Sequence, residues 1–455
     1  GTLRLACVSV DTLNPVVTNH ASVSDFLSLI YEGLFVLKSD QSVEGVLAKG
    51  YTVSGNNTVY TIELKDNIRF HSGKIFTSED VVATLNYMAM YSTRYNSFMK
   101  YIAGYSADGQ TKVVIKLNSS KTDFMNNFDF PILPKGLKGD DFAPQNTGFI
   151  PDGTGIYEYD TILAHKNIIL KSNDDWHGGE KRAYIDNVNV EILSDENTII
   201  SAFDSGVIDA ITTSWRSFGE LELTSSMFRT FENEQNRFSF VGINCQNSAF
   251  DTAPERRKLL FSIDPVKTAQ DIMLGHAVAA YTPVRESAYY NTDSLSQDEN
   301  KEEQLKENET VKISDCRLLY NSDSKTKTRL AVAVRQQLEA AGYTVTLDGH
   351  EFSVYSDMVA LGDYDLYIGE VLLTGGCDMQ FMFSSPMDGI CNYDDGEFRA
   401  LVTNLDIASG IEEKKQSWQN FKKYYRNSAI QVPLYFTNGA SFINKRIKGK
   451  LTPNL

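Results

Sequence analysis

The spacing of hydrophobic positions changes twice in the first part of the chain. Leu3–Val10 is a short apolar run with polar neighbours, which predicts a first strand that Asp11–Pro15 breaks. Ser24–Tyr31 then carries apolar residues at helical spacing, and Gly33 ends that helix. Leu34–Leu37 is a second run typical of a strand. The order strand, turn, helix, strand predicts a βαβ unit.

The pattern shifts to alternation from Gln41 to about Lys121. Runs such as Tyr60–Leu64 and Lys112–Leu117 place apolar side chains at every second position, as in strands with one solvated face. One helix interrupts them after Thr77, which is placed to cap it, because carboxylates follow in the first helical turn. We therefore predict a β-rich insert in this part of the chain.

The second half returns to alternating strands and helices. Val188–Leu193 predicts a strand, Ser194 caps a helix that Gly206 ends, and Ile208–Ile211 predicts the next strand. Lys325–Ala341 has apolar residues at four-residue spacing and predicts a long amphipathic helix. No internal repeat or low-complexity linker is visible, so the chain is expected to form an α/β architecture.

Length, charge and composition narrow the classes of function that the chain can have. The 455 residues suffice for two or three domain-sized units. With 43 basic and 59 acidic residues, the net charge is 43 − 59 = −16, which favours solubility and disfavours nucleic acid as a partner. No stretch approaches the roughly 20 apolar residues that span a membrane. No signal peptide is visible.

The chain lacks the common local motifs of catalysis and metal binding. It has no phosphate loop, no G-x-S-x-G elbow and no H-E-x-x-H, and its six histidines are dispersed. We therefore expect no catalytic residues, no bound metal and no cofactor. Of the five cysteines, Cys7 and Cys245 lie in apolar runs and are expected to be buried free thiols. Cys377 and Cys391 lie in loop-rich sequence, and a disulfide between them is left open.

One block carries a resemblance to a known family. From Arg69 the sequence is RFHSGKIFTSEDVVATLNYM, which resembles the "FHDG…T-x-E-D-V" signature of the family 5 extracytoplasmic solute-binding proteins. These are the oligopeptide-, dipeptide- and nickel-binding components of ABC importers. Further likenesses follow in family order along nearly the whole chain. They include DTLNP at Asp11, YEGL at Tyr31, GTGIYEY at Gly153 and AFDSGVIDA at Ala202.

The resemblance implies a fold and a division of the chain. The fold is the two-lobed, α/β periplasmic-binding-protein type II architecture, enlarged to three subdomains, with a hinge between the lobes. Lobe one would comprise residues 1–240 plus 433–455, with a β-rich subdomain inserted at about 39–152. Lobe two would comprise residues 241–432. Ser239–Asn244 and Gln431–Phe436 would be the hinge strands.

The chain departs from the peptide-binding pattern in lobe two. Relatives commonly carry "G-W-x-x-D-Y-x-D-P", whose first Asp pairs with the amino terminus of a peptide. Here Glu370 replaces the Trp, and Leu373 stands where that Asp would fall. If Glu370 faces the cleft, an unpaired carboxylate there is costly, so the ligand would be expected to bring an amine, a guanidinium or several donors.

Other positions expected to line the cleft are strand ends and their neighbours. The full set of predicted ligand-binding residues is Asn14, Asn19, His20, Trp215, Arg216, Glu370, Thr374, Tyr435 and Phe436. His71 and His177 stand beside glycine turns and are instead predicted to be hydrogen-bonded structural residues.

The resemblance implies a binding protein rather than an enzyme. It would capture a small ligand, foremost a peptide or peptide-like molecule, and deliver it to the permease of an ABC transporter. We expect an extracytoplasmic monomer, held at the membrane only through a lipid anchor outside this sequence. The alternatives are a nickel- or metal-chelate-binding member of the same family, a peptide or glycan hydrolase, and a ligand-sensing receptor.

Overall fold

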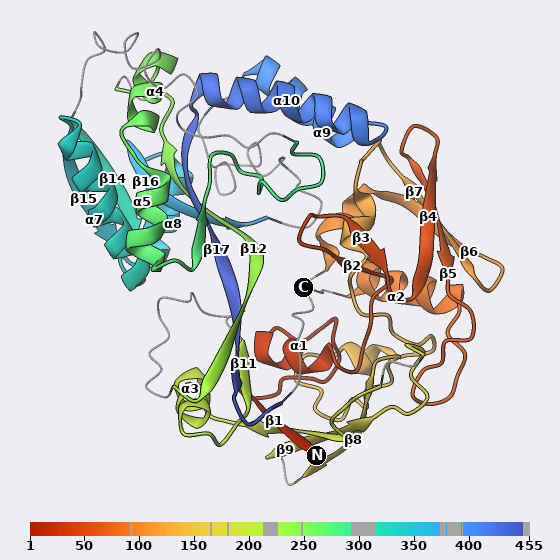
Figure 1. Ribbon diagram of the computed structural model, residues 1–455. Coiled ribbons are helices and arrows are strands. Elements are labelled where there is room, and N and C mark those ends of the chain that lie inside the picture. Colours follow the sequence, from red (N-terminus) through yellow and green to blue (C-terminus); the bar gives the residue numbers. More distant parts are fainter. Residues whose placement is uncertain are drawn as a thin grey trace.

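The structure is a computed structural model of the chain. It describes residues 1–91, 93, 95–163, 166–179, 182–212, 226–246, 249–292, 315–373, 379, 393 and 395–448. Three groups of elements surround a pair of long strands near the centre (Figure 1).

Lobe one is built on a four-stranded sheet of order β1-β10-β9-β8, in which β1 and β10 are parallel. Its elements are β1 (Thr2–Cys7), α1 (Ala21–Leu27), η3 (Gly139–Phe142), β8 (Tyr157–Leu163), β9 (Asn167–Ser172), β10 (Asn187–Ile192), α3 (Glu196–Asp204) and β11 (Ala210–Thr212). One core cluster joins this sheet to α1 through Cys7, Phe26 and Val188. The predicted first strand and helix are present, each within a few residues of its expected bounds. The predicted βαβ unit is wrong, because β1 pairs with β10 and the next strand, Phe35–Leu37, pairs antiparallel with Val43–Gly45 in a separate sheet.

The predicted β-rich insert is also present. Its elements are β2 (Phe35–Leu37), β3 (Val43–Gly45), β4 (Ala48–Ser54), β5 (Val59–Leu64), α2 (Ser78–Met90), η1 (Asn96–Tyr101), β6 (Ile102–Asp108), β7 (Lys112–Leu117) and η2 (Phe124–Asn127). The sheet order is β4-β5-β7-β6, with β2 and β3 as a separate pair. The alternation in β5 buries Tyr60, Ile62 and Leu64 against a core that α2 covers. Asp80 accepts the backbone N–H of Thr77 at 2.8 Å, so the predicted helix start is confirmed.

Lobe two adds helices to both faces of the largest sheet. Its elements are α4 (Ala253–Phe261), α5 (Pro265–Met273), β13 (Ala277–Ala279), β14 (Asp315–Asn321), α7 (Lys325–Ala340), β15 (Thr344–His350), α8 (Phe352–Leu361), β16 (Leu366–Leu372), α9 (Gly396–Ile407) and α10 (Ile411–Ser428). Strands β15, β14 and β16 are parallel neighbours. The core lies between this sheet and the helices, with Trp418 and Phe421 of α10 fully buried in it.

Two long strands connect the lobes. β12 (Phe228–Ile243) and β17 (Gln431–Asn444) pair antiparallel over most of their length. At one end β17 pairs with β11 of lobe one, and at the other β12 pairs with β16 of lobe two. We call this pair the hinge ribbon. It includes the predicted segment Gln431–Phe436 and all of Ser239–Asn244 except Asn244. It extends well beyond both, because polar residues such as Glu232 and Asn438 hide its lobe-one half from a hydrophobicity pattern.

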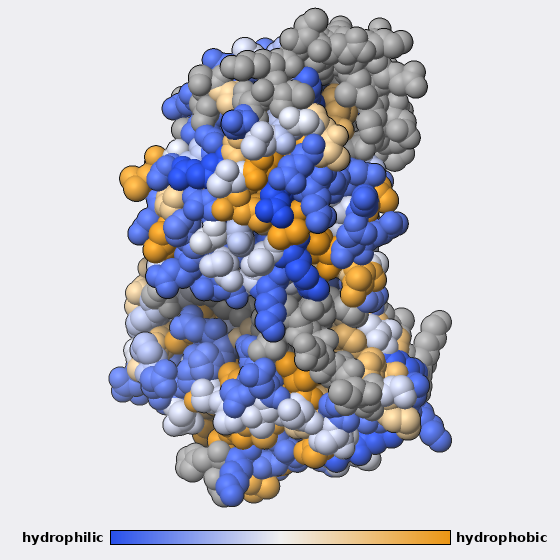
Figure 2. Space-filling view, turned by 90° about the vertical axis from the view of Figure 1, so that its left-hand side faces the viewer, coloured by the Kyte–Doolittle hydropathy of each residue, from blue (hydrophilic) through white to orange (hydrophobic). Residues whose placement is uncertain are grey.

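The predicted lobe boundaries stay a prediction. The buried clusters cross them, because Leu34 and Phe35 pack with the insert while Tyr87 and Phe142 pack with lobe one. Separate apolar clusters fill lobe one, the insert and lobe two. On the face that carries α7, hydrophilic residues predominate and apolar ones are scattered among them (Figure 2). Among the described residues, no helix has both the length and the apolar composition that crossing a membrane requires.

Candidate functional site

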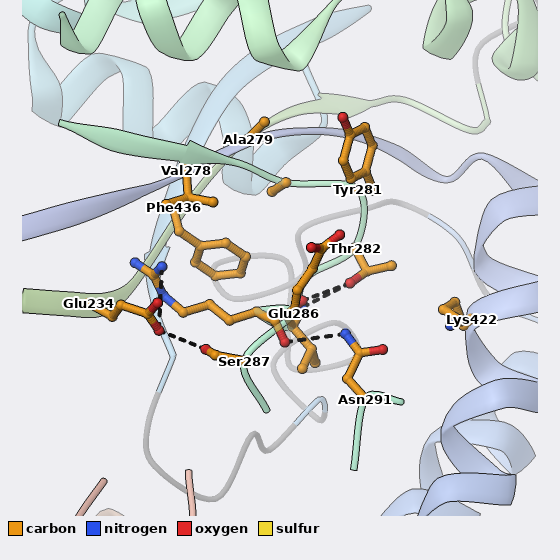
Figure 3. A pocket seen from close by; sticks show the side chains of 13 residues that line it. Glu234, Val278, Ala279, Tyr281, Thr282, Glu286, Ser287, Asn291, Lys422 and Phe436 are labelled. Atoms are coloured by element: carbon orange, nitrogen blue, oxygen red, sulfur yellow. Dashed lines mark hydrogen bonds and ion pairs between the residues drawn. The ribbon is translucent and has the colours of Figure 1, made fainter. Parts of the chain in front are cut away.

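A cavity of about 200 Å³ lies beside the hinge ribbon (Figure 3). Its wall is formed by both ribbon strands, by β13 with the segment that follows it, and by α10. The lining residues are Glu234, Val278, Ala279, Ala280, Tyr281, Thr282, Val284, Arg285, Glu286, Ser287, Asn291, Lys422 and Phe436. A site at the junction of two lobes is a common place for a small ligand, because both lobes supply groups to it.

Arg285 is the central charge of this wall. It is only 4% exposed, and its guanidinium donates to the backbone oxygens of Gln235 at 2.8 Å and Thr437 at 3.2 Å. The cation also lies 4.8 Å from the centre of the Phe436 ring. Burial lowers the pKa of Arg285 to about 10, and the nearby Glu234 carboxylate opposes that shift. Arg285 therefore ties lobe two to both strands of the hinge ribbon.

Glu234 connects the ribbon to the segment that carries Arg285. Its carboxylate accepts the Ser287 hydroxyl at 2.7 Å and lies 3.9 Å from the Arg285 guanidinium (Figure 3). Glu286, which is exposed, adds a second carboxylate to the lining. The cavity thus offers acceptor groups and two aromatic side chains, Tyr281 and Phe436, a combination suited to a polar ligand with donor groups.

The predicted residues Tyr435 and Phe436 point to opposite faces of the ribbon, as neighbours in a strand must. Phe436 lines the cavity, whereas Tyr435 is 1% exposed and lies in the core of lobe two. Burial raises the pKa of Tyr435, and a hydrogen bond with the Ser239 hydroxyl partly offsets that rise. The two therefore cannot line the same wall.

Glu370 lies on the same side of the ribbon as Ser239, at the end of β16. Its carboxylate is 3.1 Å from the Arg237 guanidinium and 2.7 Å from the Lys327 ammonium, and it accepts the Ser239 hydroxyl at 3.2 Å. Burial would raise the pKa of Glu370, but Lys327 and then Arg237 outweigh it and hold that pKa below its ordinary value.

These contacts correct one expectation. The argument that a ligand must supply a cation assumed an unpaired carboxylate, and the chain itself supplies two cations to Glu370. The cluster of Glu370, Arg237 and Lys327 carries one negative and two positive charges, so its net charge is +1. It lies where β16 ends and α7 begins, at the carboxyl ends of parallel strands, which is where open α/β sheets bind ligands. We call it the Glu370 cluster.

The predicted residues of lobe one lie around the start of α1. Asn14 is fully buried; its side-chain amide donates to the Asp141 backbone oxygen at 2.8 Å, and its side-chain oxygen accepts the Val16 N–H at 3.1 Å. Asn19 is exposed, and its backbone N–H donates to Asp11 at 2.9 Å. Both polar atoms of the Asn14 side chain thus have protein partners, while Asn19 presents its side chain to solvent.

His20 precedes the first helical residue of α1, and its ring nitrogen Nδ1 contacts the Ser9 backbone oxygen. Trp215, Arg216 and Thr374 lie outside the described residues, as do Cys377 and Cys391. Cys7 and Cys245 are buried free thiols, as predicted, and burial raises their pKa values to about 12 and about 11. Ligand contact by any of the nine predicted residues stays a prediction.

Sequence reasoning missed the charged residues that dominate the cavity and the Glu370 cluster. Arg285, Glu234, Arg237 and Lys327 come from segments without a motif, and their importance depends on pairings between residues far apart in the chain. Lys327 could have been noticed as a cation in the first turn of a predicted helix, an unusual position because that end of a helix disfavours positive charge. In the described part of the chain, no three His, Cys, Asp or Glu side chains are grouped so as to hold a metal ion.

Comparison with known proteins places the chain in a family. Residues 42–385 match the family described as bacterial extracellular solute-binding proteins, family 5 (Middle). The chain belongs to this family. Membership in this family shows that the protein is extracytoplasmic and of the solute-binding class. The relatives reported below are named as binding proteins.

Relatives and solved structures agree with this assignment. The chain is 22% identical to the oligopeptide-binding protein AppA of Bacillus subtilis over 99% of this chain and 88% of that protein. It is 27% identical to the glutathione-binding protein GsiB of Escherichia coli, over 61% of this chain and 55% of GsiB. Thus the matched region spans about half the length of GsiB.

The fold is shared with crystal structures of the same class. The substrate-binding protein CtaP of Listeria monocytogenes superposes with a TM-score of 0.80, at 20% identity over 99% of this chain and 95% of that one. AppA of Bacillus subtilis in complex with a nonapeptide gives 0.66, at 19% identity over 99% and 96%. The predicted two-lobed α/β fold is confirmed.

The family-like motifs meet at one structural junction rather than at the cavity. His71 Nδ1 accepts the Gly153 N–H at 3.3 Å, and its Nε2 contacts the Gly155 backbone oxygen at 2.9 Å. Nearby, Glu32 contacts His177 at 2.7 Å. Because both ring nitrogens of His71 have protein partners, its predicted role as a hydrogen-bonded turn residue is confirmed, and so is that of His177.

Proposed function

We propose that this family 5 protein captures a peptide between lobe one and lobe two and delivers it to an ABC importer. The observation that carries the proposal is the hinge ribbon, which pairs with β11 of lobe one and with β16 of lobe two. It bears Arg237 and Glu234, which form ion pairs with residues of lobe two. Ligand binding in such a fold draws the lobes together by rotation about the connecting strands. The oligopeptide-binding name of AppA and its nonapeptide complex support a peptide as the ligand class.

The Glu370 cluster supports a finer statement about the ligand. With a net charge of +1, the cluster favours an anionic group, so the proposed ligand presents a carboxylate to Arg237 and Lys327. This reverses the charge preference expected from the sequence. A carboxylate on a guanidinium is a strong, charge-assisted interaction, and the ligand group would share both cations with Glu370.

Further details of the proposal concern the remaining predicted residues and the cellular setting. Asn19 and His20 would contact this ligand from lobe one, together with Trp215, Arg216 and Thr374, whereas Phe436 would contact a ligand only from the cavity on the other face of the ribbon. The protein would act as a monomer in the periplasm or at the outer face of the membrane, held there by a lipid anchor outside this sequence.

Native mass spectrometry of the freshly purified protein tests the proposal directly. We expect an added mass that fragments into amino-acid residues, and exchange of that mass for peptides from a synthetic library. Titration calorimetry would then rank library members by affinity. Retention of a metal chelate with no peptide exchange would favour the metal-chelate alternative, and cleavage of library peptides would favour the hydrolase.

A further inference from the structure

Lobe two contacts the insert at a second place, away from the hinge ribbon. Lys414 at the start of α10 lies 3.3 Å from Asp123 of the insert, and Lys121 of the insert lies 3.4 Å from Asp406 at the end of α9. The Tyr289 hydroxyl donates to Asp123 at 2.7 Å. We call this set of contacts the clasp.

The clasp is dry. Side-chain exposure is 4% for Lys414, 9% for Lys121 and 14% for both Asp123 and Asp406. Both ammonium groups have additional partners: Lys414 donates to the Leu405 backbone oxygen at 2.9 Å, and Lys121 lies 4.4 Å from the centre of the Tyr101 ring. Charges this deeply buried are tolerated only when they are paired, and here each partner carboxylate belongs to the other body.

Hydrogen bonds to the backbone fix the same contact. The Ala408 oxygen accepts from the Asn57 side chain at 2.8 Å and from the Thr122 hydroxyl at 2.5 Å. The Thr122 N–H donates to the Asp406 oxygen, and the Tyr289 N–H donates to the Asp40 oxygen at 2.8 Å. Main-chain groups of lobe two and the insert are therefore held in register, which is more than two flexible side chains can achieve.

One helix connects the clasp to the hinge ribbon. α10 begins next to the clasp and ends just before β17 starts (Figure 1). Its 18 residues at 1.5 Å each make a rod of about 27 Å. Trp418, Phe421 and Tyr425 on its buried face pack into the core of lobe two, so the rod moves with that lobe.

We propose that the clasp is a second pivot for lobe closure. Two rigid bodies attached at two separated places keep one rotation, about the line through both attachments, here the clasp and the hinge ribbon. The clasp then persists in the open and closed forms and restricts lobe two to a single axis. This inference goes beyond ligand capture and does not depend on what the ligand is.

The clasp can be tested in the ligand-free protein. The two backbone N–H groups that cross it, those of Thr122 and Tyr289, report its opening by hydrogen exchange. We expect protection comparable to that of hinge-ribbon amides such as Val241. In the double variant Asp123→Asn/Lys414→Met, protection of both should fall by about tenfold or more. Exchange of both amides in the wild type as fast as in exposed turns would overturn the proposal.

A distance measurement separates a pivot from a merely stabilising contact. Spin labels at Ser201 on α3 and Gln336 on α7 would report the separation of the lobes. Freed from the clasp, the double variant should show a broader distance distribution than the wild type, because a second rotation becomes available. An unchanged width would overturn the pivot, even if the melting temperature falls.

The matched control is Lys49→Met, which removes an exposed ion pair to Asp66 within the insert. It should change neither exchange at Thr122 nor the distance distribution. If the double variant does not fold, Lys414→Arg keeps the charge but alters the fit in a closed site, and a partial loss of Thr122 protection is then expected. Unchanged Thr122 protection in Lys414→Arg would count against the clasp as the controlling contact.

Discussion

The insert meets its two neighbours by different physical means. Toward lobe one it shares α2, which buries Val81 and Leu85 in the insert core and Tyr87 in the lobe-one core. Toward lobe two it relies on the clasp, where paired charges and backbone hydrogen bonds replace apolar contacts. The first junction cannot separate without exposing a core, whereas the second can turn if its polar partners stay matched. In the proposed closure, the lobe that moves is therefore attached to the insert by polar groups and the lobe that stays fixed is attached by apolar groups.

The largest effect should come from the junction between the insert and lobe one, which we call the fixed junction. Gly153 lies so close to the backbone of Ile30 that an added Cβ would stand 2.1 Å from its oxygen. Gly153→Ala should lower the free energy of unfolding by on the order of 3–4 kcal/mol, because backbone must move and the hydrogen bonds to His71 move with it. Urea denaturation measures this loss. Gly104→Ala, where nothing lies within 4 Å, should change it little; equal losses would refute the close-approach explanation.

The clasp should give the next largest effect. Lys414→Met leaves Asp123 buried without its cation, although the Tyr289 hydroxyl remains, so we expect a loss of on the order of 2–3 kcal/mol in the free energy of unfolding. Adding Asp123→Asn should recover part of it, because the uncompensated charge disappears. A double-mutant cycle by denaturant titration gives the coupling. Strictly additive losses would mean that the two groups do not act as a pair.

The contrast also explains what the sequence could and could not reveal. The fixed junction depends on local signals, namely a helix cap at Thr77, glycine turns and a histidine beside them, and these were predicted correctly. The clasp depends on Lys414 meeting Asp123, residues almost three hundred positions apart, and each by itself is an ordinary surface charge in sequence. Pairings of this kind become visible only when the fold has brought the segments together.

The prediction of ligand charge at Glu370 failed for the same reason. The sequence showed that a carboxylate replaces an aromatic residue, but not that Arg237 and Lys327 would reach it from another strand and a helix, 133 and 43 positions away. The two-lobed architecture, in contrast, was predictable, because hydrophobic periodicity and ordered motifs are properties of short segments. Charge balance at the site is a property of the assembled fold.

A smaller effect is expected at His71, within the fixed junction. His71→Ala removes the contacts of both ring nitrogens with the Gly153 and Gly155 backbone. The free energy of unfolding should fall by about 1–2 kcal/mol, the usual cost of leaving such groups without partners. Affinity for the retained ligand, measured by calorimetry, should stay within a few-fold. A large loss of affinity at unchanged stability would instead place His71 in the binding site.

The smallest effect on stability should come from Glu370→Gln, and its main consequence should be selectivity. The carboxylate has a lowered pKa in the folded state, so its stabilising contribution is complete above its ordinary value of 4.5 and is lost as pH falls through the lowered value. At neutral pH the substitution removes two ion pairs that are partly exposed, and it costs on the order of 1 kcal/mol.

Selectivity should change because Arg237 and Lys327 are then left without their carboxylate. Peptides that carry an additional Asp or Glu should bind Glu370→Gln more tightly than the wild type, by up to about tenfold, while neutral analogues change little. Glu286→Gln is the control, since it removes the same charge from the cavity lining on the other face of the ribbon. If both variants shift affinity equally, net charge alone is responsible. If Glu370→Gln weakens peptides that carry an additional Lys or Arg, Glu370 itself contacts the ligand, and the preference for a cationic group expected from the sequence is restored.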